Sequence, residues 1–194
     1  MFIELTDHLC CTAPHDESFL VLLPGRMDGR LVVEGVLGCP VCQREVPVHE
    51  GVADFGGGTP AAGPTGLAAE AAHALLGLEG PGGYLLLVGA AGSLAGGLAA
   101  LLPGIRGVAV NPEAGMGDSP VASVLRADRL PVRRASMRGA VISRDHAGDP
   151  EWLAATIGAV LPGLRVVAEG PVTGLPGIEI LAEAGGWWVG RRSR

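Results

Sequence analysis

The sequence predicts an α/β protein in two parts. A small metal-binding ribbon of antiparallel strands is followed by a reduced, mainly parallel sheet that ends in an antiparallel hairpin. Cysteine and histidine residues at metal-ligand spacing stand in the first quarter of the chain, and the remainder alternates strand-length apolar runs with Ala- and Leu-rich runs. Residues 56–64 lack large apolar side chains and separate the two patterns. We therefore expect a ribbon domain over residues 1–55, a Gly/Pro linker over 56–66 and a second domain over 67–194.

Composition excludes a disordered chain and a strongly basic surface. With 194 residues and 48% hydrophobic content, the chain can form one ordinary core and a small one. The net charge of -6 argues against nucleic-acid binding by the whole surface. A local arginine-rich stretch, from Arg126 to Arg138, could meet RNA phosphates. Since the chain contains no lysine, its arginines indicate a biased genome, and we favour a solvated loop over an RNA site.

The cysteine pattern and the hydropathy predict a cytoplasmic location. No apolar run approaches the ~20 residues that span a bilayer, and the first residues lack the charged and apolar regions of a signal peptide. The four cysteines are grouped at metal spacing rather than spread as disulfide partners, as is typical of a reducing compartment.

Two short pairs of residues, Cys11-x3-His15 and Cys39-x2-Cys42, have the spacing of the two halves of a zinc site. Cys39 and Cys42 are too close to bridge each other easily but can share a metal ion. Pro14 allows a turn between Cys11 and His15, and residues 16–38 are long enough for a hairpin that brings the pairs together. Such a closed set predicts a structural Zn2+ with no open position for water.

The first pair of ligands leaves alternatives open. Cys10 or His8 could take the place of Cys11. In a competing interpretation, Cys10 and Cys11 are buried apolar residues and His15 lies on the surface.

The ribbon elements follow from the residues around these ligands. Residues 19–23 and 31–37 predict a hairpin joined through 24–29, and residues 45–55 alternate and then turn at Glu50-Gly51. Cys39-Pro40-Val41-Cys42 followed by Val46-Pro47-Val48-His49-Glu50-Gly51-Val52-Ala53-Asp54 resembles the second knuckle and the tail of the zinc-ribbon family that activates tRNA and ribosomal methyltransferases. The resemblance covers about residues 5–55. It departs from the family at Cys11-x3-His15, where a second cysteine pair is more usual.

The second part alternates strand and helix, which predicts parallel strands with crossover helices. Tyr84 to Val88 is a continuous apolar run suited to a central strand. The expected helices are 67–79, 94–102 and 151–161, and the expected strands are 84–88, 106–110, 121–127, 139–143, 164–168, 178–182 and 187–191.

Four segments of this part resemble the class I S-adenosylmethionine-dependent methyltransferase family and imply its Rossmann-like fold. Residues 84–93 stand where the family has its glycine-rich loop, and 127–132 stand at the segment after the third strand. Residues 141–143 and 161–167 resemble the fourth strand and the approach to the fifth. The resemblance implies a cofactor site at Gly89, Gly92, Asn111 and Asp128, in which Asp128 accepts a hydrogen bond from the adenine amino group.

The implied cofactor chemistry is depleted. Leu87 occupies an acidic place in the first strand, and Ala91 and Ser93 replace usual glycines. Asn111 stands near the acidic residue that would accept both ribose hydroxyls, and an amide does so only in part. We therefore expect weak S-adenosylmethionine binding. Alternatively, Gly89 and Gly92 only permit tight strand-to-helix packing, and Asp128 is a turn residue.

These patterns favour a zinc-binding, methyltransferase-like protein that acts as a non-catalytic scaffold or partner subunit. The alternative is an active methyltransferase that uses its ribbon to recognise RNA or protein. No catalytic residue is identified, although Asp145 and His146 could form a proton acceptor pair. Residues 113–120, 129–138 and 169–176 are too short or too rich in Gly and Pro for crossover helices. We expect a protein partner or second copy to cover the exposed sheet, with Trp187 or Trp188 in the contact.

Overall fold

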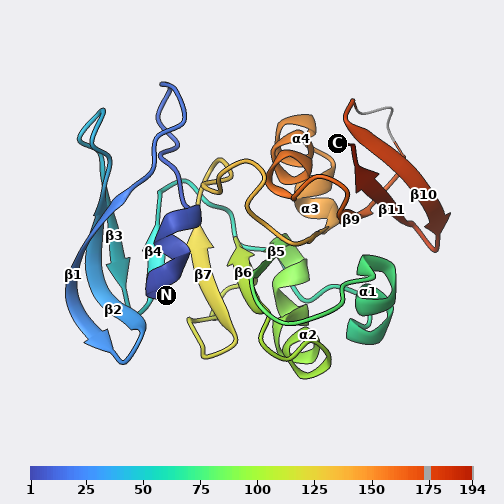
Figure 1. The fold of residues 1–194 in the computed structure, drawn as a ribbon, viewed down its shortest axis with the longest axis horizontal. Helices are drawn as coiled ribbons and strands as arrows, with labels where there is room; N and C mark the ends of the chain where they lie inside the picture. Colours follow the sequence, from blue (N-terminus) through green and yellow to red (C-terminus); the bar gives the residue numbers. More distant parts are fainter. Residues whose placement is uncertain (173–175, 194) are drawn as a thin grey trace.

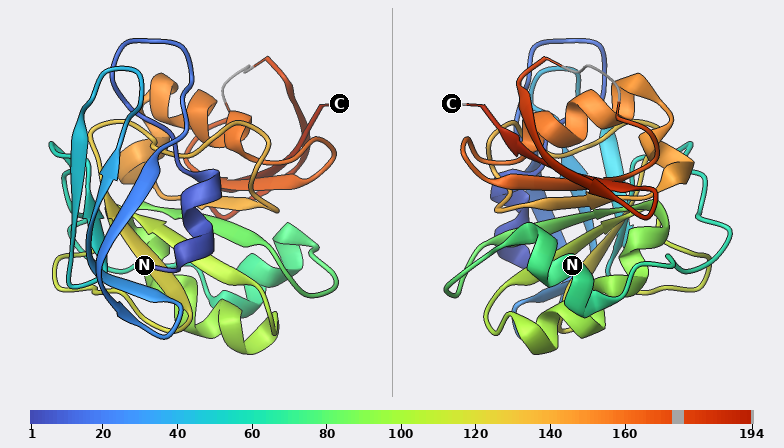
Figure 2. Two further views of the ribbon diagram at one scale, coloured as in Figure 1. Left: turned by 60° about the vertical axis from the view of Figure 1, so that its left-hand side comes forward. Right: turned by 90° about the vertical axis from the view of Figure 1, so that its right-hand side faces the viewer.

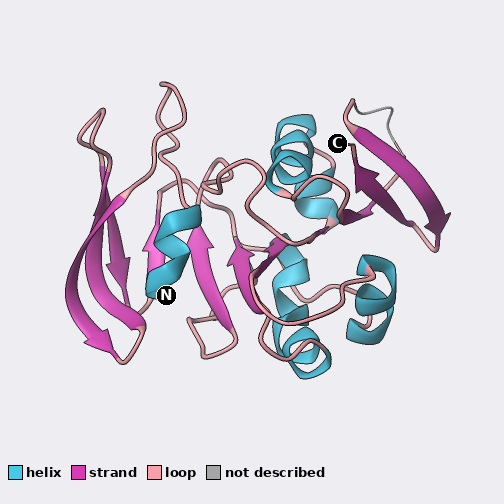
Figure 3. Cartoon of the chain, viewed as in Figure 1, coloured by secondary structure: helices cyan, strands magenta, loops and turns pink. Residues whose placement is uncertain are grey.

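One eleven-stranded sheet runs through the computed structural model, which describes residues 1–172 and 176–193 (Figure 1). The strand order is β1-β2-β3-β4-β7-β6-β5-β8-β9-β11-β10. Helices flank the central part of the sheet, so the predicted α/β class is confirmed (Figure 3). The strands are β1 Val21–Asp28, β2 Leu31–Gly38, β3 Glu45–His49, β4 Val52–Asp54, β5 Tyr84–Val88, β6 Arg106–Val110, β7 Ala122–Arg126, β8 Ala140–Ile142, β9 Arg165–Glu169, β10 Ile178–Ala184 and β11 Trp187–Arg192.

The first four strands form an antiparallel meander. Val46 and Val48 of β3 are buried, whereas their neighbours along the strand are exposed, as the period of two predicts. β3 and β4 are joined by the predicted turn at Glu50 and Gly51. Both residues have a positive φ, 48° and 80°, which suits the right-handed twist of a tight hairpin.

The next strands form the parallel core of the sheet. β5 lies between β6 and β8, β7 follows β6, and β9 follows β8, and every one of these pairs is parallel. Counted along the chain, these five strands have the order 3-2-1-4-5, which is that of a doubly wound sheet. β11 is antiparallel to both β9 and β10, so the predicted C-terminal hairpin closes this side.

The ribbon and the parallel strands are joined by backbone pairing. β4 lies parallel to β7, with Ala53 opposite Leu125 and Asp54 opposite Arg126. Side chains from both parts also belong to one hydrophobic core, as Leu37 and Val110 illustrate. The division at residues 56–66 stays a prediction, but the two parts share a sheet and a core.

Helices cover both faces of the parallel strands (Figure 2). Leu85 and Leu87 point to the face covered by α1 and α2, whereas Leu86 and Val88 point to the face covered by α3 and α4. This alternation explains why β5 is apolar at every position. The helices are α1 Ala69–Leu76, α2 Ala95–Leu101, α3 Arg144–Ala147 and α4 Pro150–Ala159, with 3-10 turns η1 Ile3–His8 and η2 Gly89–Leu94.

The expected bare sheet faces are not present in the described part of the chain. The N-terminal η1 takes the place of a missing crossover helix, because Leu5 and Leu9 are fully buried in the core that contains Val108. The Phe2 amide donates to Ser123 Oγ of β7 at 2.9 Å, which fixes η1 against the sheet. The prediction that a partner must cover these strands is therefore wrong.

The paired tryptophans place one indole on each face of β11. Trp188 is 2% exposed and belongs to the core with η1 and α4, so it is not available to a partner. Trp187 is half-buried against the cluster formed with α1 and α2. Both indoles contribute to packing within the chain.

The element boundaries differ from expectation mainly where glycine ends a helix. α1 stops at Leu76 because Gly77 adopts a left-handed φ of 57° and caps the helix. The strands at 84–88 and 106–110 match the prediction, whereas η1 and α3 were not predicted. Within the described ranges, the helices are too short or too polar to cross a membrane; the cytoplasmic location stays a prediction.

The packing of η1 leads to a stability prediction. Leu5→Ala should lower the free energy of unfolding by about 2–5 kcal/mol, because the change leaves a cavity under a fully buried side chain. Leu23→Ala is the matched control, since Leu23 is 63% exposed, and it should cost well under ~1 kcal/mol. Urea unfolding of both variants measures the difference. Equal effects would mean that η1 does not cover the core.

Candidate functional site

Two loops hold the predicted metal ligands at one end of the ribbon. Cys39 and Cys42 lie in the tight turn after β2, where the Gln43 amide donates to the Cys39 carbonyl at 2.9 Å. Cys11 and His15 lie in the loop between η1 and β1. The Cys11 amide donates to the Ser18 carbonyl at 2.9 Å, so this loop is closed by its own backbone.

The structure brings the four side chains together with the geometry of a metal centre. Their ligand atoms all lie within 4.8 Å of one another. Cys11 Sγ and Cys42 Sγ are 3.7 Å apart, and Cys39 Sγ is 3.4 Å from His15 Nε2. In a tetrahedral site with metal–sulfur distances of about 2.3 Å, the ligand atoms are separated by about 3.8 Å. The four residues could therefore hold one metal ion.

A backbone contact orients the His15 ring for coordination. His15 Nδ1 lies 2.7 Å from the Asp16 carbonyl oxygen. Because a carbonyl only accepts, Nδ1 carries the hydrogen and donates it. In the neutral ring Nε2 then has a free lone pair that faces Cys39, as metal-ligating histidines require.

The thiols differ in how easily they ionise. Burial opposes ionisation of Cys39, but the backbone N–H groups of Cys42 and Val41 donate to its sulfur, and together with further thiol contacts they lower its pKa to about 6. Burial raises the pKa of the Cys11 thiol to about 11. Cys39 is thus prepared as a thiolate, whereas Cys11 needs a bound cation to lose its proton.

The alternative ligands for the first pair are placed elsewhere. Cys10 is buried, and burial raises its pKa to about 12. The His8 ring packs edge-on against Tyr84 with 5.1 Å between ring centroids. Of the three candidates, Cys11 contributes its sulfur to the cluster.

A second candidate site lies at the carboxyl ends of three neighbouring parallel strands, where open sheets bind ligands. Gly89, with a φ of 68°, follows β5, Asn111 follows β6, and Asp128 lies two residues beyond β7. Gly92 lies deeper, and a Cβ there would come within 2.7 Å of Pro112 Cβ. This position supports the packing interpretation for Gly92.

The Asn111 side chain is turned into the protein. It is 2% exposed. Its Nδ2 donates to the Ala127 carbonyl at 2.8 Å, and its Oδ1 accepts from the Ala127 amide at 2.9 Å. Both ends of the amide are therefore used to tie β6 to the segment after β7, and neither is free for a ribose hydroxyl.

Asp145 and His146 contact the loop after β5 and the Asn111 side chain. The sequence placed the two residues at this sheet edge but did not predict these contacts. Asp145 accepts from the Ala90 amide at 3.3 Å, and a Cβ on Gly89 would lie 2.5 Å from its carboxylate. His146 is buried, with Nε2 3.1 Å from Asn111 Nδ2 and Nδ1 3.5 Å from Asp145. The pair is engaged within the protein rather than poised toward an open site.

The arginine-rich stretch is partly engaged within the chain. Arg138 donates to the carbonyls of Glu79, Gly80, Pro81 and Gly82. Arg133 donates to the Asp7 carbonyl at 3.1 Å and pairs with Glu17 at 3.7 Å. These contacts hold loops in place, and the preference for a solvated loop over an RNA site stays a prediction.

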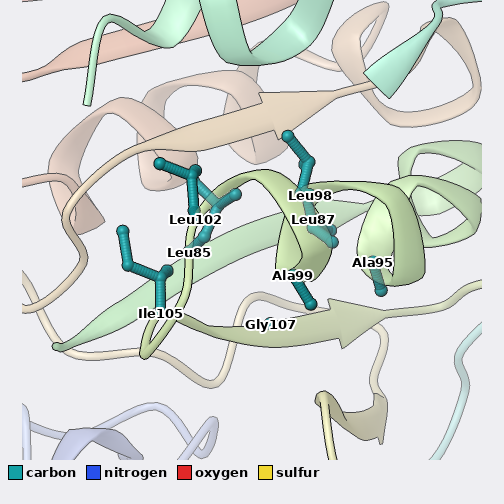
Figure 4. Close-up of a pocket in the computed structure, with 8 residues that line it drawn as sticks. All are labelled: Leu85, Leu87, Ala95, Leu98, Ala99, Leu102, Ile105 and Gly107. Carbon is teal, nitrogen blue, oxygen red and sulfur yellow. The ribbon is translucent and has the colours of Figure 1, made fainter. Parts of the chain in front are cut away.

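The hollows among the described residues differ in size and in lining. The space between α2 and the sheet is lined by apolar residues such as Leu87 and Leu98 and measures about 10 Å³, room for about one water molecule (Figure 4). A surface cavity of about 210 Å³ lies beside Asp128, Trp152 and Glu151. It is smaller than the ~300 Å³ of small ligand pockets. A wider surface hollow of about 570 Å³ is lined by Arg144, Leu153 and Glu169.

Comparisons with known proteins find partial similarity to solved structures. No family model matches the chain, and no curated protein matches it. Among solved structures, the antibiotic-resistance methyltransferase Kmr is 17% identical, with 71% of this chain and 98% of that chain covered and a TM-score of 0.45.

Two further structures are similar over part of their length. Geranyl diphosphate C-methyltransferase from Streptomyces coelicolor A3(2) is 14% identical, with 52% of this chain and 43% of that chain covered and a TM-score of 0.43. A chain assigned as a methyltransferase, solved in complex with the Haloferax volcanii Trm112 methyltransferase activator, is 22% identical, with 52% and 50% covered and a TM-score of 0.42. This chain thus spans half or less of their lengths. Its central strand order is that of a doubly wound, Rossmann-like sheet, extended by a C-terminal antiparallel hairpin.

Adjacent cysteines provide a test of the metal ligands. Cys11→Ala should abolish stoichiometric metal binding, because it removes one of four ligand atoms. Cys10→Ala should retain the metal, since its thiol is not in the cluster. Elemental analysis of the two purified variants measures the contrast. Full occupancy in Cys11→Ala would refute this ligand set.

Asp145 leads to a prediction on acid stability. Burial opposes its ionisation, but contacts with His146 and with the Ala90 amide lower its pKa below the ordinary value. The ionised form thus stabilises the folded state above about pH 4, and this contribution is lost as the pH falls through the lowered pKa. Asp145→Asn should flatten the fall in unfolding free energy between about pH 5 and 3. Exposed Glu183→Gln is the control, and an unchanged slope in Asp145→Asn would argue against the network.

Proposed function

We propose that this chain is a zinc-stabilised, methyltransferase-like scaffold without a working cofactor site of its own. The observation that carries the proposal is the state of Asn111. It is the polar side chain expected to hold the ribose, and both ends of its amide bond the Ala127 backbone. A nucleoside would have to break these buried bonds without an equivalent replacement, which costs about 1–3 kcal/mol per unpaired group.

The depleted residues of the first strand support the same function. Leu87, which stands in an acidic place, is fully buried against α1 and α2. The backbone N–H of Ala90, which could meet a ligand carboxylate, already donates to Asp145. The Asn111 amide and the Ala90 N–H thus already form hydrogen bonds within the chain.

Zinc is the metal that we propose for the four-ligand set. Three sulfurs and one imidazole in tetrahedral arrangement are typical of structural zinc sites. The ion would join the loop of Cys11 and His15 to the turn of Cys39 and Cys42, since each supplies two of the four ligand atoms. A closed set of this kind would contribute folding energy rather than catalysis.

One observation supports a second function. Asp128 lies exposed at the carboxyl end of β7, where the family resemblance places the contact with the adenine amino group. An active S-adenosylmethionine-dependent methyltransferase, with the ribbon recognising RNA or protein, is therefore the alternative that we propose to test directly.

A scaffold implies a protein partner, or a second copy of the chain, and the covered faces of the parallel sheet do not supply the surface for it. Exposed apolar side chains occur instead beside and along the edge strand β1, where Phe19, Val21 and Leu23 are 59%, 47% and 63% exposed. An edge strand with outward apolar residues is a common contact surface. We propose that a protein partner, rather than RNA, meets the ribbon on this side.

Titration calorimetry with S-adenosylmethionine tests the function. Metal-loaded protein should give no saturable heat at concentrations up to about 1 mM, because ligand binding must break the internal bonds at Asn111 and Ala90. A dissociation constant at or below the low micromolar range, lost in Asp128→Ala, would instead establish the methyltransferase alternative. Ser193→Ala is the control variant: it changes a surface side chain away from the crevice and should behave as the wild type in the titration.

A further inference from the structure

The segment between β4 and α1 crosses the carboxyl ends of three parallel strands. In Figure 1 its cyan to teal trace passes over the arrowheads of β7 and β6 on its way to α1. From Gly56 onward, backbone hydrogen bonds join it to the end of each of these strands. The three bonds run from the Asp128 amide to the Gly56 carbonyl at 3.0 Å, from the Ala61 amide to the Asn111 carbonyl at 3.2 Å, and from the Thr65 amide to the Ala90 carbonyl at 3.2 Å.

Glycine lets this segment lie directly on the strand ends. A Cβ added at Gly58 would be 2.4 Å from Asn111 Oδ1 and 2.6 Å from the Ala127 nitrogen. At Gly57, where φ is 71°, a Cβ would be 2.9 Å from Asp128 Cβ. No side chain larger than hydrogen fits between the segment and Asn111, so the segment fills the space that a ligand at this edge would need.

Both ends of the segment are anchored. At the start, Phe55 is 2% exposed, its amide donates to the Arg126 carbonyl at 2.7 Å, and its carbonyl accepts from Arg44, which follows the metal knuckle. At the other end, the Thr65 amide lies 3.2 Å from both the Ala90 carbonyl and Ser93 Oγ. The fixed ends keep the segment aligned over the strands.

The middle of the segment makes few apolar contacts. Ala61 is buried, but the positions at 59, 60, 62 and 64 are exposed. A segment held mainly by a few backbone hydrogen bonds opens locally at low cost compared with unfolding of the core. Its Gly- and Pro-rich composition is therefore compatible with a segment that lies across the crevice and can detach from it while the core stays folded.

We propose that residues 56–65 are a built-in plug of the crevice. They occupy the place of a nucleoside ligand such as an S-adenosyl compound, and any such ligand must displace them. The plug goes beyond the scaffold function and does not depend on it, because a gated enzyme would need the same displacement. The apparent affinity for such a ligand would then depend on the fraction of molecules in which residues 56–65 are displaced, and not only on the contacts that the ligand makes.

Two glycines of the same segment give a matched test. Gly58→Val places a side chain where a Cβ meets Asn111 and Ala127, whereas Gly63→Val adds the same side chain where nothing lies within 4 Å. Amide hydrogen exchange of the full, metal-loaded chain is measured at Ala61, Thr65 and Asp128. Gly58→Val should exchange at least about tenfold faster at these amides, and Gly63→Val should match the wild type within about twofold.

A second variant covers the case in which Gly58→Val fails to fold. Thr65→Pro removes the N–H that donates to Ala90 without adding bulk under the segment. It should also speed exchange at Ala61 and Asp128, while the amides of β5 stay protected. Unchanged exchange at Ala61 and Asp128 in a folded Gly58→Val or Thr65→Pro variant overturns the plug.

Binding of S-adenosylhomocysteine separates the plug from the proposed function. Faster exchange in the opened variant with no binding supports both the plug and the scaffold. Faster exchange with binding that is at least about tenfold tighter than in the wild type supports the plug and overturns the scaffold. Micromolar binding by the wild type that leaves exchange at Ala61 and Thr65 unchanged overturns the plug.

Discussion

The parallel pairing of β4 with β7 is the contact on which the rest of this structure depends. It extends the doubly wound sheet into the ribbon, so the short strands around the metal ligands gain a large hydrophobic neighbour. It also covers the edge of β7, which would otherwise expose unpaired backbone groups. Because β4 ends at Asp54 beside Arg126, the chain must leave the ribbon at the carboxyl edge of the parallel strands. The path of the following residues across the crevice results from this single register.

Several polar groups in the crevice at the carboxyl ends of β5, β6 and β7 form hydrogen bonds within the chain. Asn111 bonds Ala127, Asp145 bonds Ala90, and the glycines after Phe55 lie on the strand ends. An open parallel sheet normally leaves these groups to a ligand. Their internal pairing uses donors and acceptors that would otherwise favour ligand entry. The doubly wound sheet can therefore be maintained as a closed structural unit without a ligand at this edge.

Much of the fold was predictable because local patterns determine it. β5 and β6 match their predicted ranges. β5 is a continuous apolar run between glycines, a pattern that suits a strand buried on both faces. The four candidate metal ligands were predicted from residue spacing, including Cys11 rather than Cys10, and in the structure the side chains of these four residues lie together. η1 was missed because Ile3–His8 has no helical period or cap, and its burial depends on Ser123 and other residues far along the chain.

The sequence by itself determined the α/β class and the strand periodicity. It also determined the ligand types of the candidate metal set and the absence of acidic side chains at Leu87 and Asn111. All of these depend on residue identity and short spacing. Only the tertiary structure decided what covers the sheet and what fills the crevice. Coverage by η1 and occupation by residues 56–65 are long-range contacts between segments that are weakly patterned on their own. Such segments acquire a position only when the strands around them have assembled, because backbone hydrogen bonds at Asn111 and Ala90 become available there.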